Sequence, residues 1–179
     1  MTVTVREELP FVEDILGERE AVLGLSLEGY RNHVCRMVNF GLAFGELSPQ
    51  DEEKVVIAGV FHDLGIWTDN TFDYLPPSID MSREYLTRID RADLSDHISQ
   101  MIGEHHKLRR FKGDALTEVF RKADLVDVSL GVINFGLDAG YIKDVKERFP
   151  NNGFHAGLLK TAGRWICRHP LNPVPVLRW

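Results

Sequence analysis

The sequence predicts a single all-α domain of about seven helices that spans residues 1–179. Apolar residues recur every three or four positions along nearly the whole chain, which is the period of an amphipathic helix. No segment alternates convincingly between apolar and polar residues as a half-buried strand does. The exception is the N-terminus, where the sequence leaves room for one short strand. The length of 179 residues, with 44% hydrophobic and 27% charged residues, is typical of one globular domain.

Composition and charge exclude several classes of protein. The chain has 21 Lys+Arg and 27 Asp+Glu, and this net charge of −6 argues against a nucleic-acid polymer as a partner, since such binders present a basic face. The longest apolar run, residues 55–61, is far shorter than the roughly 18 residues of a membrane span, so we expect no membrane partner. The N-terminus has no apolar signal core, and two cysteines are too few for a disulfide framework. We therefore expect a cytoplasmic protein.

The first two long helices follow from their apolar stripes and their end signals. A stripe from Glu28 to Phe44 predicts a helix with one apolar face. Ser48 is then a good N-cap, followed by Pro49 at the first helical position and by acidic residues in the first turn. This second helix contains the apolar run, so we expect it to be central and buried, with Gly65 as its C-terminal stop.

The later stripes complete the bundle. A loop is expected from Thr68 to Pro77, because its Asp-Asn and Pro-Pro pairs break helices. Prolines in the tail from Pro170 to Trp179 predict an extended segment packed on the surface. The stripes that carry the candidate chemistry lie within residues 28–130, and residues 141–179 hold the C-terminal helices and the tail. Helices are expected over about Ile79–Ile89, Leu94–His106, Leu116–Leu130, Tyr141–Phe149 and His155–Cys167.

The most informative pair of residues is His62-Asp63, which directly follows the most apolar segment of the chain. Burying an ionised carboxylate or an unpaired imidazole is costly, so some partner must compensate both. A divalent metal ion does this, because it accepts imidazole nitrogen and carboxylate oxygen together. Adjacent helical residues point about 100° apart, so this pair can share one ion only at the end of a helix.

Further histidines and aspartates lie on the stripes that are predicted to face inward. His33 lies at the edge of the apolar face of its helix, and Asp124 and Asp127 compete for an inward position on another. His105 is in phase with the core, and His106 follows it. Two histidines and two aspartates from separate helices would form an open, mononuclear metal site of the catalytic kind. For each residue alone, the alternative is a hydrogen-bonded core residue or a histidine at a helix end.

A basic segment follows these histidines. Residues 107–112 hold four cations in an otherwise acidic chain, among them Lys107 and Arg109, and this local reversal of charge suits a phosphate. A solvated loop is the alternative interpretation. Arg31, close to His33, is a further candidate for binding phosphate. The loop after His62-Asp63 offers aromatic side chains that either stack on a ring of the substrate or only close the core: Trp67, Phe72 and Tyr74.

Taken in order, His33, His62-Asp63 and Asp124 resemble the pattern of the HD-domain metal-dependent phosphohydrolase superfamily, in which His, His-Asp and Asp lie on an all-helical scaffold. The resemblance covers roughly residues 28–130 and favours Asp124 over Asp127. It implies an HD-domain-like bundle with one divalent ion per chain, held by His33, His62, Asp63 and Asp124. The ion could be Mn, Fe, Ni, Co, Zn or Mg, because imidazole and carboxylate ligands admit all of them.

The same resemblance implies an enzyme, a phosphoric ester hydrolase that acts on a small phosphorylated molecule such as a nucleotide by means of a metal-activated water. Asp63 would orient or deprotonate the water, and His105 or His106 would contact the substrate or a weak second ion. Many members of the superfamily have a lysine shortly after His-Asp, where this chain has Ile66. The cations that would bind the phosphate are Lys107, Arg109 and Arg31.

Two alternatives to the phosphohydrolase stay open. Some HD proteins hold two irons and cleave their substrates with dioxygen, which requires extra histidine ligands between Asp63 and Asp124. The histidines available there are His97, His105 and His106. The second alternative is a metal-stabilised helical domain that binds a ligand without turning it over. The sequence leaves the oligomeric state open.

Overall fold

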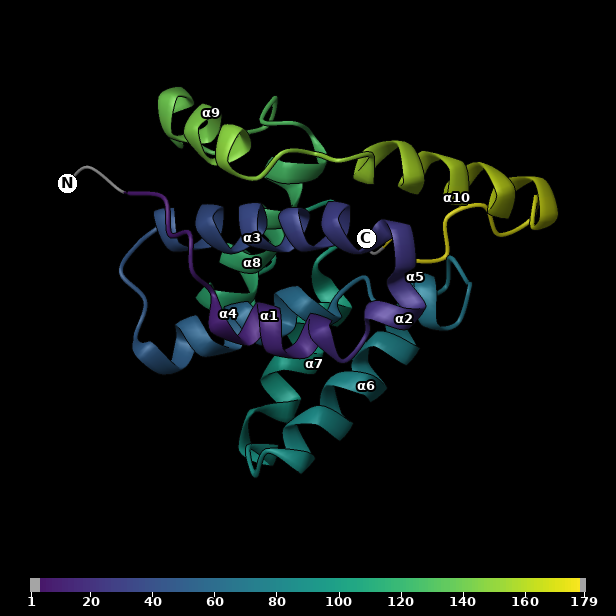
Figure 1. Cartoon of the computed structure of the whole chain (residues 1–179), viewed down its shortest axis with the longest axis horizontal. Coiled ribbons are helices and arrows are strands. Elements are labelled where there is room, and N and C mark those ends of the chain that lie inside the picture. Colours follow the sequence, from purple (N-terminus) through teal and green to yellow (C-terminus); the bar gives the residue numbers. More distant parts are fainter. Residues whose placement is uncertain (1–3, 178–179) are drawn as a thin grey trace.

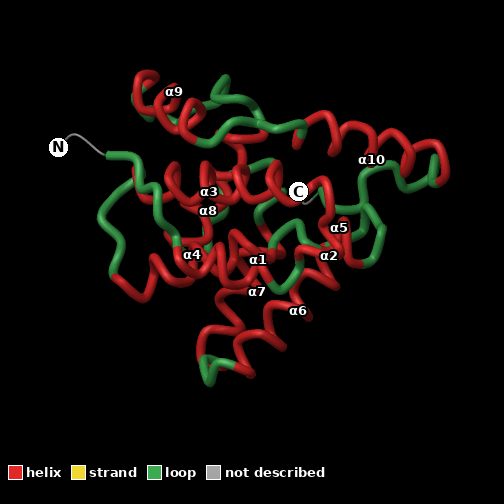
Figure 2. The backbone as a smooth tube through the Cα atoms, viewed as in Figure 1, coloured by secondary structure: helices red, strands yellow, loops and turns green. Residues whose placement is uncertain are grey.

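The computed structural model describes residues 4–177. All regular structure in this range is helical, which confirms the predicted fold class (Figure 2). Ten α-helices are present, of which α2 and α5 have only four residues, so the number of longer helices is close to the predicted one. None of the described helices has the length and apolar character needed to cross a membrane. The bounds are α1 Pro10–Gly17, α2 Glu20–Leu23, η1 Gly24–Ser26, α3 Leu27–Ala43, α4 Pro49–Phe61, α5 Gly65–Thr68, α6 Leu75–Arg88, η2 Ala92–Leu94, α7 Ser95–Glu104, α8 Ala115–Val128, α9 Ala139–Arg148 and α10 Phe154–Arg168.

Helices α3 and α4 form the centre of the bundle. Helix α3 packs against α8, α4 and α1, and α4 packs against α7, α6 and α1. Residues 55–61 of α4 are all buried, as expected for its long apolar run. Helices α9 and α10 form a further layer over α3, on the side away from α6 and α7 (Figure 1).

Small residues and one tyrosine set the close packing of α3, α4 and α8. A Cβ atom on Gly41 of α3 would lie 3.4 Å from Val55 Cγ1 on α4 and 3.7 Å from Ala123 Cβ on α8. The buried Tyr30 hydroxyl of α3 donates a hydrogen bond to the carbonyl oxygen of Val60 on α4, at 2.8 Å. These contacts hold the three helices that carry the predicted ligands in one arrangement.

The ends of α4 follow the sequence signals only in part. Ser48 caps the helix as predicted, because its side chain accepts a hydrogen bond from the backbone N–H of Asp51. The prediction that Gly65 stops this helix is wrong, since α4 ends at Phe61 and Gly65 begins α5. Glycine is required at position 65 for space: a Cβ atom there would lie 2.7 Å from the carbonyl oxygen of Tyr74.

Two other segments differ from the prediction at their boundaries. The loop predicted from Thr68 to Pro77 covers only residues 69–74, and α6 begins at Leu75. The two prolines lie in the first turn of α6, where a residue without an N–H group costs no helical hydrogen bond.

The N-terminal segment contains a helix that was not predicted and no strand within the described residues. Val12, Ile15 and Leu16 form the buried stripe of α1. Before α1, the backbone of Arg6 is held by the side chain of Asn39 on α3, which accepts its N–H at 2.7 Å and donates to its carbonyl oxygen at 3.0 Å. The described residues before α1 are therefore tied to α3 at Arg6 and do not form the short strand for which the sequence leaves room.

The C-terminal tail is also less extended than predicted. Residues 169–177 fold back from the end of α10 through turns, and Val176 is buried in the core (Figure 1). The last residue of the predicted tail, Trp179, lies outside the described residues.

Replacing Gly65 by alanine tests the close approach of the chain after α4. We expect Gly65→Ala to lower the free energy of unfolding by about 1–3 kcal/mol, because the new methyl group forces backbone apart. Urea unfolding followed by circular dichroism measures the change. The control is Gly163→Ala on α10, where a Cβ atom meets nothing within 4 Å. Equal stability of the two variants would contradict the proposed steric requirement.

Candidate metal centre

The predicted metal ligands come together from three helices. His33 lies on α3, His62-Asp63 directly after α4, and Asp124 on α8, and none of them is more than 4% exposed. The Nε2 atoms of His33 and His62 are 3.1 Å apart, and each lies 3.7 Å from Asp124 Oδ1. Asp63 Oδ2 is 3.5 Å from His62 Nε2. The ligand atoms of His33, His62 and Asp63 are close enough to share one metal ion.

The end of α4 explains how adjacent residues reach one point. The helix ends at Phe61, and His62 is the C-cap residue, still helical in its backbone angles. Its Nδ1 lies 2.7 Å from the carbonyl oxygen of Gly59, so the ring is fixed by the last turn of its own helix. Asp63 follows in a turn and so is free of the 100° separation of helical neighbours.

The ring orientations point the Nε2 atoms of both histidines inward. His33 Nδ1 lies 2.7 Å from Asp127 Oδ2, and a carboxylate there can only accept, so Nδ1 carries the proton. The same reasoning places the proton of neutral His62 on Nδ1, facing the carbonyl oxygen of Gly59. Two lone pairs then face each other across 3.1 Å beside the Asp124 carboxylate. Such an arrangement of buried acceptors requires a cation or an added proton between them.

Asp127 supports the site through an interaction that the sequence did not predict. It lies on α8 one turn after Asp124 and accepts two hydrogen bonds from the buried guanidinium of Arg36, at 2.5 and 2.8 Å. Arg36 also donates to the carbonyl oxygen of Phe149. The pKa of Asp127 is held well below its usual range, because the hydrogen bonds from Arg36 and His33 outweigh its burial. A carboxylate behind a histidine in this way fixes the orientation of its ring.

The charges in the cluster already favour an added positive charge. Burial alone would lower the pKa of His62, but the carboxylates of Asp63 and Asp124 outweigh burial and raise it to about 9. Burial likewise opposes the charged form of Asp63, but His62 and His105 hold the pKa of this carboxyl well below its usual range. Without an ion, a proton on His62 Nε2 can therefore bridge to His33, 3.1 Å away.

A second set of possible ligands shares Asp63. His105 and His106, which follow α7, bring ligand atoms close enough to Asp63 to hold an ion together with it. The Nδ1 atom of His105 lies 2.7 Å from the carbonyl oxygen of Ile102, so its Nε2 points inward. This Nε2 and Asp63 Oδ1 are both buried and have no hydrogen-bond partner, and they lie 3.6 Å apart. Two orphaned acceptors that face each other fit a cation between them.

Two aromatic side chains, one from the loop after α5 and one from α10, contact histidines of the cluster. The Tyr74 hydroxyl donates a hydrogen bond to His106 Nε2, whereas the sequence led us to expect this side chain to stack on a ring of the substrate or to close the core. The ring of Phe154, the first residue of α10, stacks on His33 with centroids 4.1 Å apart. No pattern in the sequence pointed to the contact between Phe154 and His33.

The predicted phosphate-binding cations lie at the margin of the site. Arg31 is partly exposed and donates to Glu13, which occupies its guanidinium. Lys107 is half-buried and lies 3.5 Å from Glu104, whereas Arg109 is exposed. Both belong to the segment that directly follows His106, so they adjoin the second set of ligands in the chain.

The chain has no match among protein-family models, curated proteins or solved structures. The fold class and the geometry of the cluster therefore stand on this structure alone.

Removing Asp127 tests the buried support of His33. We expect Asp127→Ala to lower the free energy of unfolding by about 3–5 kcal/mol, because Arg36 would remain buried without its partner. Urea unfolding measures the loss. Asp144→Ala, at an exposed position on α9, is the control and should stay within about 0.5 kcal/mol of the parent protein. A loss of less than about 1 kcal/mol in Asp127→Ala would show that the pair contributes little.

Metal binding should release protons at neutral pH. Because the pKa of His62 is about 9, this imidazole carries an extra proton at pH 7 that a metal ion must displace. We expect about one proton released per ion at pH 7, and an affinity that rises with pH until the pH reaches the pKa of His62. Titration calorimetry with Mn²⁺ or Zn²⁺ in buffers of different ionisation enthalpy counts the protons. No proton release at pH 7 would contradict the charge state derived above.

Proposed function

We propose that this protein is a metal-dependent phosphohydrolase of the HD type that acts on a small phosphorylated molecule such as a nucleotide. The observation that carries the proposal is the convergence of His33, His62, Asp63 and Asp124 on one buried point, with imidazole lone pairs and carboxylate oxygens facing each other. Core histidines that serve packing alone use both ring nitrogens in hydrogen bonds with donors and acceptors of the protein. Here the Nε2 atoms of His33 and His62 have each other and the carboxylate of Asp124 as neighbours, and all of these groups are acceptors.

The donor set of the cluster fits a divalent cation of the kind that catalytic sites bind. All four groups are imidazole or carboxylate, without the thiolates that mark closed structural zinc sites. A divalent ion bound by this set would polarise a phosphoryl oxygen and lower the pKa of a water molecule next to it. Cys35 is buried on the same helix as His33, but burial raises its pKa to about 12, so it stays a thiol and does not compete as a ligand.

The chain supplies its own groups for moving a proton. Asp63 presents Oδ2 toward His62 and leaves Oδ1 buried and without a partner, so Oδ1 can accept a hydrogen bond from an attacking water. Burial and the neighbouring His105 lower the pKa of His106 to about 3, so this imidazole is neutral at pH 7. The hydroxyl of Tyr74 donates to His106 Nε2 and holds its ring in place. The cations of the following segment, Lys107 and Arg109, are suited to binding the phosphate.

A second candidate function draws on the set formed by Asp63, His105 and His106. This set would let Asp63 bridge two ions, whereas the sequence favours one ion per chain. Two irons at such a site would suit oxygen-dependent cleavage of a substrate. The number and identity of the ions separate the two functions: one divalent ion with release of phosphate supports the hydrolase, and two irons with oxygen uptake support the oxygenase.

Replacing Asp63 tests the proposed function. We expect Asp63→Ala to lose its bound ion and to lower hydrolysis at least about 100-fold, because even residues that only orient metal ligands contribute 10–100-fold. Elemental analysis of the purified protein measures the ion. Release of phosphate from a panel of phosphorylated metabolites, with Mn, Fe, Ni, Co, Zn or Mg supplied in turn, measures the activity.

Two further variants make the result interpretable. Asp63→Asn preserves the shape of the side chain, so it should fold even if the alanine variant does not, and it should still lose the ion. Asp144→Ala removes an exposed carboxylate from α9 and should keep both the ion and the activity. Full hydrolysis by Asp63→Asn, or binding of phosphorylated compounds without turnover by the parent protein, would overturn the proposal.

A further inference from the structure

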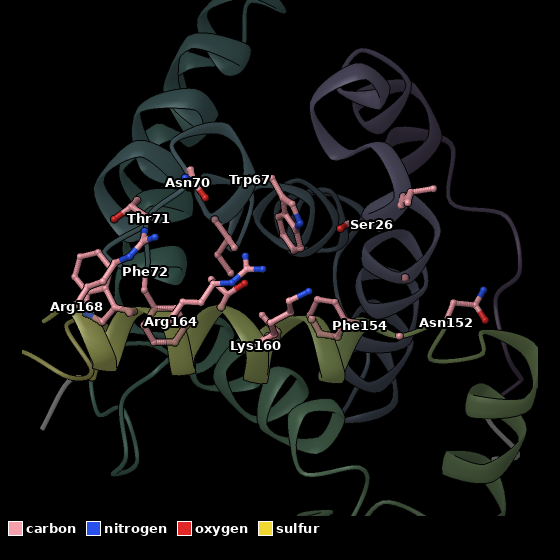
Figure 3. A pocket seen from close by; sticks show the side chains of 18 of the residues that line it. Ser26, Trp67, Asn70, Thr71, Phe72, Asn152, Phe154, Lys160, Arg164 and Arg168 are labelled. Carbon is pink, nitrogen blue, oxygen red and sulfur yellow. The ribbon is translucent and has the colours of Figure 1, made fainter. Parts of the chain in front are cut away.

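A cavity lies beside the candidate metal centre, between α10 and the segment that follows His62-Asp63. It has a volume of about 590 Å³, within the usual range for sites that bind small molecules. Its walls come from the start of α3, from α5 with the loop after it, and from one face of α10 (Figure 3). None of the candidate metal ligands lines it, so it is a separate space.

One wall of the cavity is a row of cations. Lys160, Arg164 and Arg168 recur every four residues along α10 and therefore share one face of the helix. Figure 3 shows Lys160 and Arg164 reaching from α10 toward Trp67 and Asn70, with Arg168 near Thr71 and Phe72.

These cations have no acidic counterpart. No described residue that lines the cavity is an aspartate or a glutamate, although the chain carries a net charge of −6. Among the hydrogen bonds and ion pairs of the described residues, Lys160, Arg164 and Arg168 take part in none. The helix dipole favours a cation at Arg168 in the last turn, but it does not account for Lys160 in the middle of the helix. An anionic ligand would account for the whole row.

The opposite wall is aromatic. Trp67 and Phe72 are half-buried, so each ring keeps an open part at the cavity. A third aromatic residue, Trp165, lies on α10 in the same wall as the cations. Its Nε1–H donates to the carbonyl oxygen of Asn172 and its ring stacks on His169, which fixes its position. Asn70 and Thr71 add polar groups between the two kinds of wall. Flat aromatic walls of this kind suit a planar ring.

The extent of the cation row indicates how many charges the ligand has. Arg168 lies eight positions after Lys160 on α10, which corresponds to roughly 12 Å along the helix axis. Three cations over such a length exceed what one phosphate group can engage. A ligand with a planar ring and two or more linked phosphates would contact the aromatic wall and the row of cations at the same time.

We propose that this cavity is a binding site, separate from the metal centre, for a ligand that joins a planar ring to two or more phosphates, the chemistry of a nucleoside diphosphate or triphosphate. Lys160, Arg164 and Arg168 bind the phosphates, and Trp67 and Phe72 bind the ring. The site adjoins the metal centre through a wall one side chain thick. Phe154 lines the cavity and stacks on His33, and Trp67 packs on Tyr30 at 4.6 Å between ring centroids.

The test is binding of ADP, GDP, CDP and UDP to the full chain, measured by calorimetry and by quenching of tryptophan fluorescence. Two tryptophans, Trp67 and Trp165, line the cavity and report on its occupancy. We expect at least one of the four to bind, and to bind at least about tenfold more tightly than the matching nucleoside or inorganic pyrophosphate alone. Failure of all four to bind at millimolar concentration, or pyrophosphate binding as tightly as the nucleotides, overturns the proposal.

Substitutions place the binding in this cavity. Arg164→Glu should weaken it about 10- to 100-fold, because a charge-assisted hydrogen bond is replaced by repulsion. Lys143→Glu makes the same change of charge at an exposed position of α9 and should alter affinity less than about twofold. Gly157→Phe should abolish binding by filling the cavity, and its Cβ meets nothing within 4 Å, so the helix tolerates it. Equal weakening in Arg164→Glu and Lys143→Glu contradicts a specific site.

One more variant separates this proposal from the hydrolase. In Asp63→Asn, nucleotide binding should be unchanged within about twofold, because no metal ligand lines the cavity. Loss of binding in this variant would show that the ligand is held at the metal centre and would overturn a separate site. The hydrolase is tested by release of phosphate and by ion content, so either proposal can fail while the other stands.

Discussion

The structure depends on the meeting of buried electron pairs at the end of α4. His33 and His62 turn their Nε2 atoms toward each other at 3.1 Å, beside the carboxylates of Asp63 and Asp124. Such a cluster is unfavourable by itself in a buried core, because it gathers acceptors without donors. The free-energy cost of the cluster is tolerable only if positive charge is present. The neighbouring carboxylates raise the pKa of His62 for this reason, and the same carboxylates would attract a metal ion. The surrounding helices serve to hold this arrangement against its own repulsion.

The buried guanidinium of Arg36 and hydrogen bonds to the outer nitrogens of the histidines supply that support. Arg36 and Asp127 connect α3 to α8 behind His33, and the backbone of α4 orients the ring of His62 through Gly59. The ring of each ligand histidine is therefore set from its outer nitrogen, and the inner one is left available. His105 follows the same rule on another helix, with Ile102 as the acceptor. One local device, a histidine bonded to the carbonyl three residues before it, appears twice in the site.

The sequence predicted the fold class and the inward set of histidines and aspartates because both follow helical periodicity. Asp124 lies inward on α8 beside His62, as its stripe predicted, whereas the contact of Asp127 with His33 needed coordinates. Arg36 was not predicted because arginine is rarely buried, and its partner lies 91 positions away in the chain. The apolar spacing of Val12, Ile15 and Leu16 is typical of a helix, but α1 is too short for this pattern to stand out in the sequence. The spacing of the cations on α10 was equally readable, but which segment faced them was not.

The stacking of Phe154 on His33 brings the last long helix into contact with the candidate metal centre. Phe154 is the first residue of α10, and the helix contacts the rest of the bundle mainly through α3. A rotation of α10 about its first turn would pull an aromatic plane off an imidazole that is otherwise locked from behind. The position of this helix and the orientation of the His33 ring are therefore linked. An element at the edge of the bundle thereby helps to hold a candidate ligand that none of its charged side chains contacts.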